Sequence, residues 1–94
     1  MMKVRVRAFA TLSNLLGGGP LEVELPEGST VGDLLSELAR RLGRAFREAV
    51  MEGGRLAEYV KVFVNGRDID FLSGLKTVLR DGDEVALIPP AGGG

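Results

Sequence analysis

Residues 26–43, PEGSTVGDLLSELARRLG, carry the pattern that most restricts how this chain can fold. Ser29 or Thr30 can cap a helix here, because Asp33 follows Thr30 by three residues, close to a capping box. Apolar side chains then recur at helical spacing and form one apolar face: Val31, Leu34, Leu35, Leu38 and Leu42. The sequence therefore predicts one amphipathic helix, whose apolar face must pack on another layer of structure.

Several other segments alternate between apolar and polar residues, which predicts half-buried β-strands. In residues 3–10 the alternation places Val4, Val6 and Ala8 on one side, and Lys3, Arg5, Arg7 and Phe9 on the other. The remaining alternating segments are residues 21–25, 58–70 and 80–90. Asn65-Gly66 interrupts one of them and predicts a type I′ hairpin, because both residues tolerate a positive φ.

The intervening segments are less regular. Residues 11–20 predict a helical turn or two that ends at Gly17–Gly19, and residues 44–54 predict a second, looser helix that ends at Gly53-Gly54. Residues 71–79 predict a connection with these apolar side chains packed on the core: Phe71, Leu72, Leu75 and Leu79.

The order of these elements, β-β-α-(α)-β-(β)-β, predicts an α+β fold. The ubiquitin-like β-grasp roll is the candidate: a mixed sheet of four to five strands with the main helix on one face and the other face open. We expect one β-grasp domain over residues 1–90 and a flexible glycine-rich tail over residues 91–94.

Composition removes several classes of function. The 94 residues include no cysteine and no histidine, so thiol nucleophiles, zinc–thiolate sites and the commonest general base are absent. The net charge of −1 gives no overall basic field for nucleic acid. No apolar run approaches the roughly 20 residues of a membrane span. We expect a cytoplasmic protein that binds no metal, no nucleic acid and no membrane.

Three short motifs could suggest a site, and each has a simpler explanation. DGD (81–83) lacks the further oxygen ligands of a calcium loop and predicts a turn. LGGGP (16–20) lacks the lysine and the serine or threonine of a phosphate loop and predicts a flexible connection. The third motif is a set of carboxylates that nothing places over a pocket, which predicts a solvated surface: Glu48, Glu52 and Glu58.

The open face of the predicted sheet is a candidate partner surface. If Val4 and Val6 are buried, Arg5 and Arg7 lie on the open face, and the same parity places Phe63 and Ile88 there. An apolar cluster rimmed by arginines is typical of an interface, whereas scattered apolar residues are ordinary surface, and the sequence leaves both readings open.

The carboxyl-terminal stretch PPAGGG (89–94) is the other candidate. Pro89-Pro90 stiffens the exit from the last strand, and Gly92, Gly93 and Gly94 carry no side chains, so such a segment can enter a narrow channel. It could present its terminal carboxylate to an enzyme, provided that transfer to AMP first activates the carboxylate. A frayed tail without function remains the alternative.

The stretch LRDGDEVALIPPAGGG (79–94) resembles the carboxyl terminus of MoaD, the small subunit of molybdopterin synthase, and of the wider MoaD/ThiS group of ubiquitin-like sulfur carriers. STVGDLLSEL (29–38) is similar to the helix start of that group and VFVNG (62–66) to its central hairpin. Gly93 and Gly94 match the terminal Gly-Gly, and Gly92 falls in the linker before it.

The resemblance implies a carrier that is not catalytic alone and binds no cofactor. An E1-like enzyme of the MoeB type would adenylate Gly94 with ATP, and a sulfur donor protein would convert the acyl-adenylate to a thiocarboxylate. The tail would then enter the large subunit, MoaE, and deliver sulfur to the molybdopterin precursor. Ile88 matches an apolar position that packs on the partner in this family.

Three alternatives remain open at this point. The chain could be a protein modifier that forms isopeptide bonds, like the small archaeal modifiers, or a ThiS-type carrier for thiazole synthesis. It could also be a β-grasp binding module with an inert tail. Neither the choice between molybdenum and tungsten nor the choice between Gly93 and Gly94 as the reactive end follows from the sequence.

Overall fold

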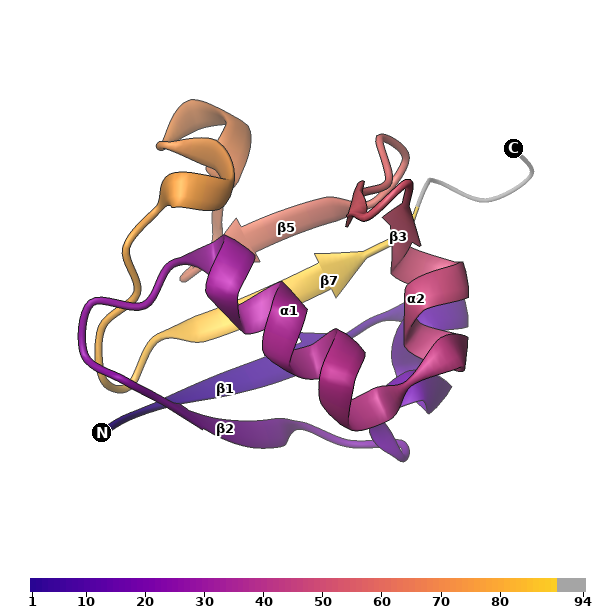
Figure 1. Cartoon of the computed structure of the whole chain (residues 1–94), viewed down its shortest axis with the longest axis horizontal. Coiled ribbons are helices and arrows are strands. Elements are labelled where there is room, and N and C mark those ends of the chain that lie inside the picture. Colours follow the sequence, from indigo (N-terminus) through magenta and orange to yellow (C-terminus); the bar gives the residue numbers. More distant parts are fainter. Residues whose placement is uncertain (90–94) are drawn as a thin grey trace.

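The structure is a computed structural model that describes residues 1–89. A mixed five-stranded sheet has the strand order β2-β1-β7-β5-β6, and helix α1 (Val31–Leu42) crosses one of its faces (Figure 1). The strands are β1 (Met2–Ala8), β2 (Leu21–Leu25), β5 (Lys61–Val64), β6 (Arg67–Asp68) and β7 (Glu84–Ile88). The sequence predicted this α+β arrangement, and the order is that of a ubiquitin-like β-grasp roll.

The sheet is mixed because β1 and β7 run parallel in its centre. β1 pairs antiparallel with β2, and β5 pairs antiparallel with β7 and with β6. Alternate residues of each strand face α1 and form the core, which includes Val4, Val6, Val62, Val85 and Leu87. The strand alternation in the sequence is therefore the alternation between a helix-covered face and an open face.

Helix α1 begins where the sequence predicted. Thr30 is its N-cap: the Thr30 hydroxyl accepts from the Asp33 N–H at 3.1 Å, and the Asp33 carboxylate accepts from the Thr30 N–H at 2.9 Å. This reciprocal pair is a capping box with aspartate in the third position. The predicted apolar face is buried at four of its five positions, and Leu42 is half-buried.

The segment after α1 differs from the prediction. Helix α2 (Arg44–Val50) ends before Met51, and residues 51–56 form a short hairpin of β3 (Met51–Glu52) and β4 (Arg55–Leu56). Gly53 and Gly54 both have positive φ and form the turn of that hairpin. The two glycines therefore form a hairpin turn and not the end of a helix. Helix α2 ends at Val50, before the predicted position, because the backbone is already extended at Met51.

The prediction for residues 71–79 is wrong in three of its four buried positions. This connection folds into two 3₁₀ turns, η2 (Ile69–Phe71) and η3 (Gly74–Lys76). Leu79 is buried, whereas Phe71 is 87% exposed and Leu72 and Leu75 are each 38% exposed. The turns direct Ile69, rather than its apolar neighbours, into the core.

The predicted hairpin at Asn65-Gly66 is confirmed. Asn65 has φ of 50° and Gly66 has φ of 85°, as a type I′ turn requires. The strand before it begins at Lys61 rather than at residue 58, because residues 57–60 form a turn in which the Val60 N–H donates to the Ala57 carbonyl. η1 (Ala10–Leu16) is the predicted helical turn between β1 and β2. Within residues 1–89 no helix combines the length and the apolar character needed to cross a membrane.

Candidate functional site

The predicted tail, residues 91–94, lies outside the described residues. Pro90, Gly92, Gly93 and Gly94 belong to the part of the chain that the structure does not describe, so their predicted roles stay predictions. Pro89, the last described residue, is half-buried and follows the end of β7 at Ile88. The described structure therefore defines the strand and the surface from which the glycine-rich end of the sequence continues.

Strand β7 is held on both sides. β1 lies along one edge and β5 along the other, and hydrogen bonds continue past the ladders at both ends. The Phe9 N–H donates to the Leu87 carbonyl at 3.1 Å, and the Asn65 N–H donates to the Glu84 carbonyl at 2.8 Å. The strand that leads into the tail is thus fixed in the middle of the sheet.

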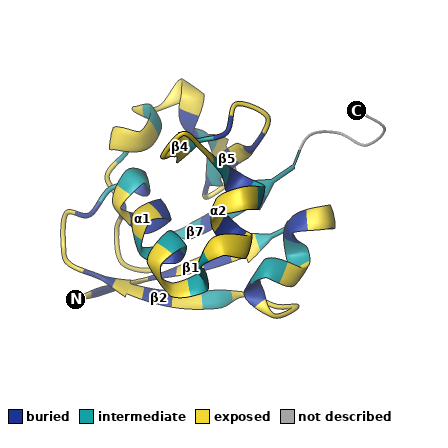
Figure 2. Cartoon of the chain, turned by 45° about the vertical axis from the view of Figure 1, so that its right-hand side comes forward, coloured by how far each residue is buried: buried dark blue, intermediate teal, exposed yellow. Residues whose placement is uncertain are grey.

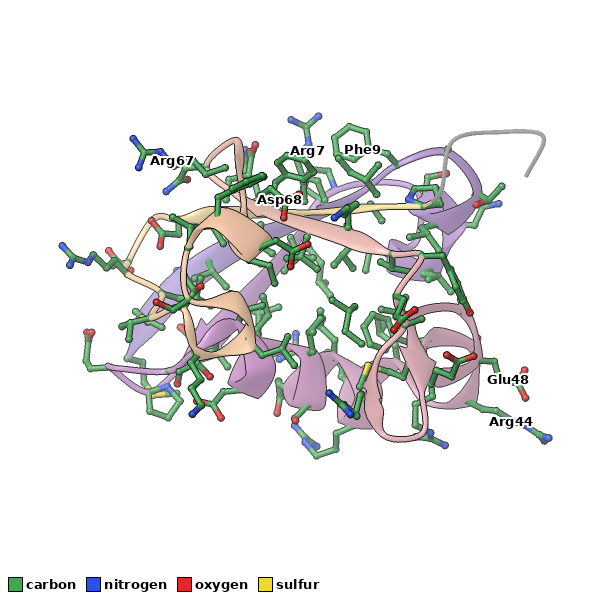
Figure 3. The ribbon with its side chains drawn as sticks, turned by 90° about the horizontal axis from the view of Figure 1, so that it is seen from above. Arg7, Phe9, Arg44, Glu48, Arg67 and Asp68 are labelled. Carbon is green, nitrogen blue, oxygen red and sulfur yellow. The ribbon has the colours of Figure 1, made fainter. Side chains whose placement is uncertain are left out.

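The open face carries an apolar group beside the end of β7. In register, Ala86 of β7 lies between Arg7 of β1 and Phe63 of β5, and Lys61 lies opposite Ile88. Phe63, Ala86 and Ile88 are half-buried, and Phe9 is 41% exposed. We call these four residues the open-face patch. Figure 3 shows Arg7 and Phe9 projecting from the sheet, away from the helices.

Charged side chains rim the open-face patch. The Arg7 guanidinium carbon lies 5.5 Å from the centroid of the Phe9 ring, within cation–π range, and an Arg7 nitrogen lies 3.8 Å from a Glu84 oxygen. The Lys61 ammonium lies 2.8 Å from an Asp70 oxygen and 3.5 Å from an Asp68 oxygen. The hydrogen bond to Asp70 and the nearby charge of Asp68 raise the pKa of Lys61 above its usual value.

The structure brings together most of the described residues that the sequence selected. Phe63, Ile88 and Arg7 share the open-face patch or its rim. Arg5 does not join them, because it lies in register with Glu22 of β2 and Glu84 of β7 on the charged half of the same face. None of these placements tests a binding role, which stays a prediction.

Sequence reasoning placed Phe9 on this face but did not select it as a member of the candidate partner surface. The parity of residues 3–10 already placed Phe9 with Arg7, but the sheet order was needed to bring Phe9 beside β7. The Phe9 N–H donates to the Leu87 carbonyl, so the backbone stays beside β7 for one residue after β1 ends. Phe9 therefore lies next to Ile88, whose side chain is half-buried. The open face is therefore more apolar at this end than the sequence alone indicated.

The DGD motif is a structural turn, as predicted. The Lys3 N–H donates to the Asp81 carboxylate at 2.8 Å, and the Asp83 carboxylate accepts from the Arg80 N–H and the Asn65 side-chain amide, each at 2.8 Å. Gly82, with φ of 87°, supplies the positive φ. Through these hydrogen bonds the carboxylates of Asp81 and Asp83 connect β1, the Asn65-Gly66 hairpin and the turn that leads into β7. Among residues 1–89 no group of three acidic side chains is placed to hold a metal ion.

The other two motifs also have structural roles on the surface. Gly17 has φ of 82° and caps η1, so LGGGP is a connection. Glu48 forms an exposed ion pair with Arg44 at 2.9 Å on α2, while Glu52 and Glu58 are exposed. Figure 3 shows Arg44 and Glu48 on the helical side of the molecule, opposite Arg7 and Phe9.

The observed β-grasp fold, with a glycine-rich sequence after its central strand β7, is the arrangement of the small ubiquitin-like carriers that the carboxyl-terminal motif resembles. A model of the ThiS family matches residues 6–94, and the chain therefore belongs to the ThiS family of sulfur carriers.

Three curated relatives span nearly the whole chain. Small archaeal modifier protein 3 of Haloferax volcanii is 37% identical over 94 residues, covering 99% of this chain and 100% of its own. A putative sulfur carrier protein of Archaeoglobus fulgidus is 33% identical over 93 residues, with the same coverage. The molybdopterin synthase sulfur carrier subunit of Mycobacterium tuberculosis is 35% identical over 95 residues, covering 100% of each chain.

Solved structures agree on the fold. The crystal structure of small archaeal modifier protein 1 of Haloferax volcanii superposes with a TM-score of 0.83 at 28% identity, covering 97% of this chain and 100% of its own. A putative molybdopterin converting factor, subunit 1, from Pyrococcus furiosus gives a TM-score of 0.77 at 35% identity, with the same coverage. The similar proteins thus include both carriers and modifiers.

Proposed function

We propose that this chain is the sulfur carrier subunit of a molybdopterin synthase, and that its terminal carboxylate at Gly94 becomes a thiocarboxylate. The observation that carries the proposal is the position of β7: the strand that leads into PPAGGG is central, fixed on both edges and flanked by the open-face patch. The relative named as a molybdopterin synthase sulfur carrier subunit supports the choice of pathway.

The proposed chemistry begins with activation, since a carboxylate alone is a poor acyl donor. A Gly94 carboxylate oxygen attacks the α-phosphorus of ATP on an E1-like enzyme, and pyrophosphate leaves. A donor protein then supplies sulfur at the oxidation level of hydrosulfide, and this sulfur attacks the carbonyl carbon. A C–S bond forms, and AMP leaves with the former carboxylate oxygen. The chain contains no histidine or cysteine, so in this proposal the partner enzymes supply the acid–base groups.

The open-face patch is the proposed docking surface for the large subunit. Ile88 and Phe63 supply apolar contact, Arg7 supplies a cation beside it, and Arg5 supplies a second cation further along the same face. Figure 2 shows how burial alternates along the sheet strands, with the helices covering the opposite face. Pro89, Pro90 and Gly92 would carry the chain from this surface into the partner's active site.

The deciding experiment is intact-mass analysis of the protein after incubation with an E1-like enzyme, ATP and sulfide. We expect a mass gain equal to the exchange of one oxygen for sulfur. The gain should be absent in a variant that lacks Gly93-Gly94 and in one extended by a residue beyond Gly94. No gain in the wild-type chain, with an enzyme that activates another carrier, would refute the carrier proposal. Sulfur transfer from the product to a pterin precursor on the large subunit then tests the pathway.

A second candidate function is covalent protein modification, because two of the similar proteins are named small archaeal modifier proteins. The activation step is shared, but a substrate lysine amine, rather than sulfur, attacks the acyl-adenylate and AMP leaves. Higher-mass conjugates that carry this chain on lysine, and that vanish on deletion of Gly93-Gly94, would favour the modifier function. A thiocarboxylate without conjugates would favour the synthase subunit.

A further inference from the structure

A second apolar surface lies on the connection between β6 and β7. Four of the seven large apolar side chains that are exposed in residues 1–89 fall within residues 71–78: Phe71, Leu72, Leu75 and Val78. Phe71 is 87% exposed and Val78 is 55% exposed. Single exposed apolar residues are ordinary, but such a concentration marks an interaction surface. We call these four residues the connection patch, which shares no residue with the open-face patch.

Hydrogen bonds hold the backbone beneath the connection patch. The Leu72 N–H donates to the Ile69 carbonyl at 2.9 Å, and the Ser73 N–H donates to the Thr77 hydroxyl at 3.0 Å. η3 also packs closely on the first turn of α1, because a Cβ built on Gly32 would lie 3.2 Å from the Leu75 carbonyl oxygen. The apolar side chains are therefore displayed on a fixed backbone, which lowers the entropy cost of binding.

A recess of about 380 Å³ adjoins this patch at Leu75. Apolar side chains from β4, the turn before β5, β5 itself and η2 contribute to its lining: Leu56, Val60, Val62 and Ile69. Charged walls come from Arg55 and Glu58 and from Lys61, Asp68 and Asp70, the last three of which form the ion-pair cluster described above. Its volume is at the lower end of the range for ligand pockets, enough to admit an apolar side chain of a partner.

Cations flank the connection patch in the chain. Arg67 precedes η2, Lys76 ends η3 and Arg80 follows Val78, and all three are exposed. Figure 3 shows Arg67 directed outward from the molecule. None of the three forms an ion pair within the described residues, whereas Arg7 and Lys61 on the open face do. The charges around the connection patch are thus available to an acidic partner.

We propose that the connection patch and its recess bind an apolar segment of a partner protein, flanked by aspartate or glutamate. A symmetric dimer of this chain would bring the same cations against one another, which disfavours a second copy as the occupant. A recess with room for one side chain favours a protein segment over a lipid surface as the occupant. A contact made by four side chains and one recess fits a weak, reversible interaction. The site uses neither the tail nor the open-face patch and is independent of the proposed function.

The test is an NMR titration of the full chain with a synthetic peptide containing two phenylalanines and a leucine flanked by glutamates. We expect amide shift changes at residues 69–80, with a Kd of roughly 0.1–1 mM that weakens as salt is added. The peptide with lysines in place of glutamates is the matched control and should bind several-fold more weakly. Absence of shift changes in this segment at about 2 mM acidic peptide, or equal binding of both peptides, would overturn the proposal.

Variants and two other probes complete the test. Phe71→Ser should weaken peptide binding about tenfold without unfolding the protein, because its side chain is exposed. Lys76→Glu should weaken it about threefold, whereas Arg44→Glu, on the helical side, should not. Unchanged affinity in Phe71→Ser would overturn the proposed surface. If anionic lipid vesicles bind through Phe71 and the peptide does not bind, the patch is a membrane contact instead. If the molecular mass in solution doubles as the protein concentration rises, the patch is a contact with a second copy.

Discussion

At the scale of single residues, Ile88 shows how one side chain serves both the sheet and the surface. Its backbone lies in register with Lys61 on β5, while its half-buried side chain belongs to the open-face patch at the end of β7. Parity along residues 80–90 was enough to place Ile88 on the open face. Its neighbours Phe9 and Lys61 could not be assigned to it from sequence, because their proximity depends on strand order.

Ile88→Asp should weaken binding to the large subunit by about tenfold or more while leaving the fold intact, because it places a carboxylate in an apolar contact. Isothermal titration calorimetry with the purified large subunit measures the change. Ala45→Asp, an exposed position on α2, is the matched control and should bind as the wild type does. An affinity equal to wild type in Ile88→Asp would remove Ile88 from the interface.

Lys61 gives a prediction on pH. Its pKa is raised in the folded protein, by the hydrogen bond to Asp70 and the charge of Asp68, so its protonated form stabilises the fold. This contribution is present below the ordinary lysine pKa of about 10.4 and is lost as pH rises through the raised folded value. Lys61→Gln should therefore be slightly less stable than wild type at about pH 8, and the difference should shrink by about pH 11 in urea unfolding curves. A difference that does not shrink at high pH would contradict this account.

At the scale of elements, the reliable signals were those in which two features agreed or a turn required particular residues. Helix α1 was predicted because its apolar face and its cap agree, and the Asn65-Gly66 hairpin because its turn needs those residues. The hairpin of β3 and β4 was missed, because two-residue strands are too short to show alternation and Gly53-Gly54 also resembles a helix end. The exposure of Phe71 was missed because the direction of a side chain in a 3₁₀ turn depends on how the turn packs.

The cap of α1 gives a prediction on stability. Thr30→Ala removes the hydroxyl that accepts from the Asp33 N–H, and it should lower the free energy of unfolding by about 1 kcal/mol. Ser36→Ala, at an exposed position of the same helix, is the control and should be neutral or slightly stabilising, because alanine favours the helix. Urea unfolding followed by circular dichroism measures both. Equal stabilities for the two variants would show that the capping box contributes little.

At the scale of the whole molecule, the core is formed entirely by packing of the sheet against α1, α2 and the turns. Phe46 of α2 and Leu38 of α1 are fully buried, and they belong to the same core cluster as residues near both ends of the described chain, such as Met2 and Leu87. Apolar periodicity predicted most of this core. The carboxylates of residues 81–83 are occupied by hydrogen bonds that join strands, which composition could not reveal.

The sequence predicts no structural metal site, so we expect the free energy of unfolding to be the same with and without EDTA. Thermal unfolding followed by circular dichroism in metal-free buffer, with and without the chelator, measures this. A midpoint that falls on chelation, and returns on addition of zinc or calcium, would show a structural metal site.

The placement of β7 between β1 and β5 has a mechanical consequence. A force that pulls on the carboxyl end of β7 acts along the strand and loads the hydrogen bonds to both neighbours in shear, together rather than one at a time. An edge strand in the same position would peel away bond by bond. A partner that grips the chain beyond Ile88 can therefore be separated from the domain by pulling without unravelling the sheet.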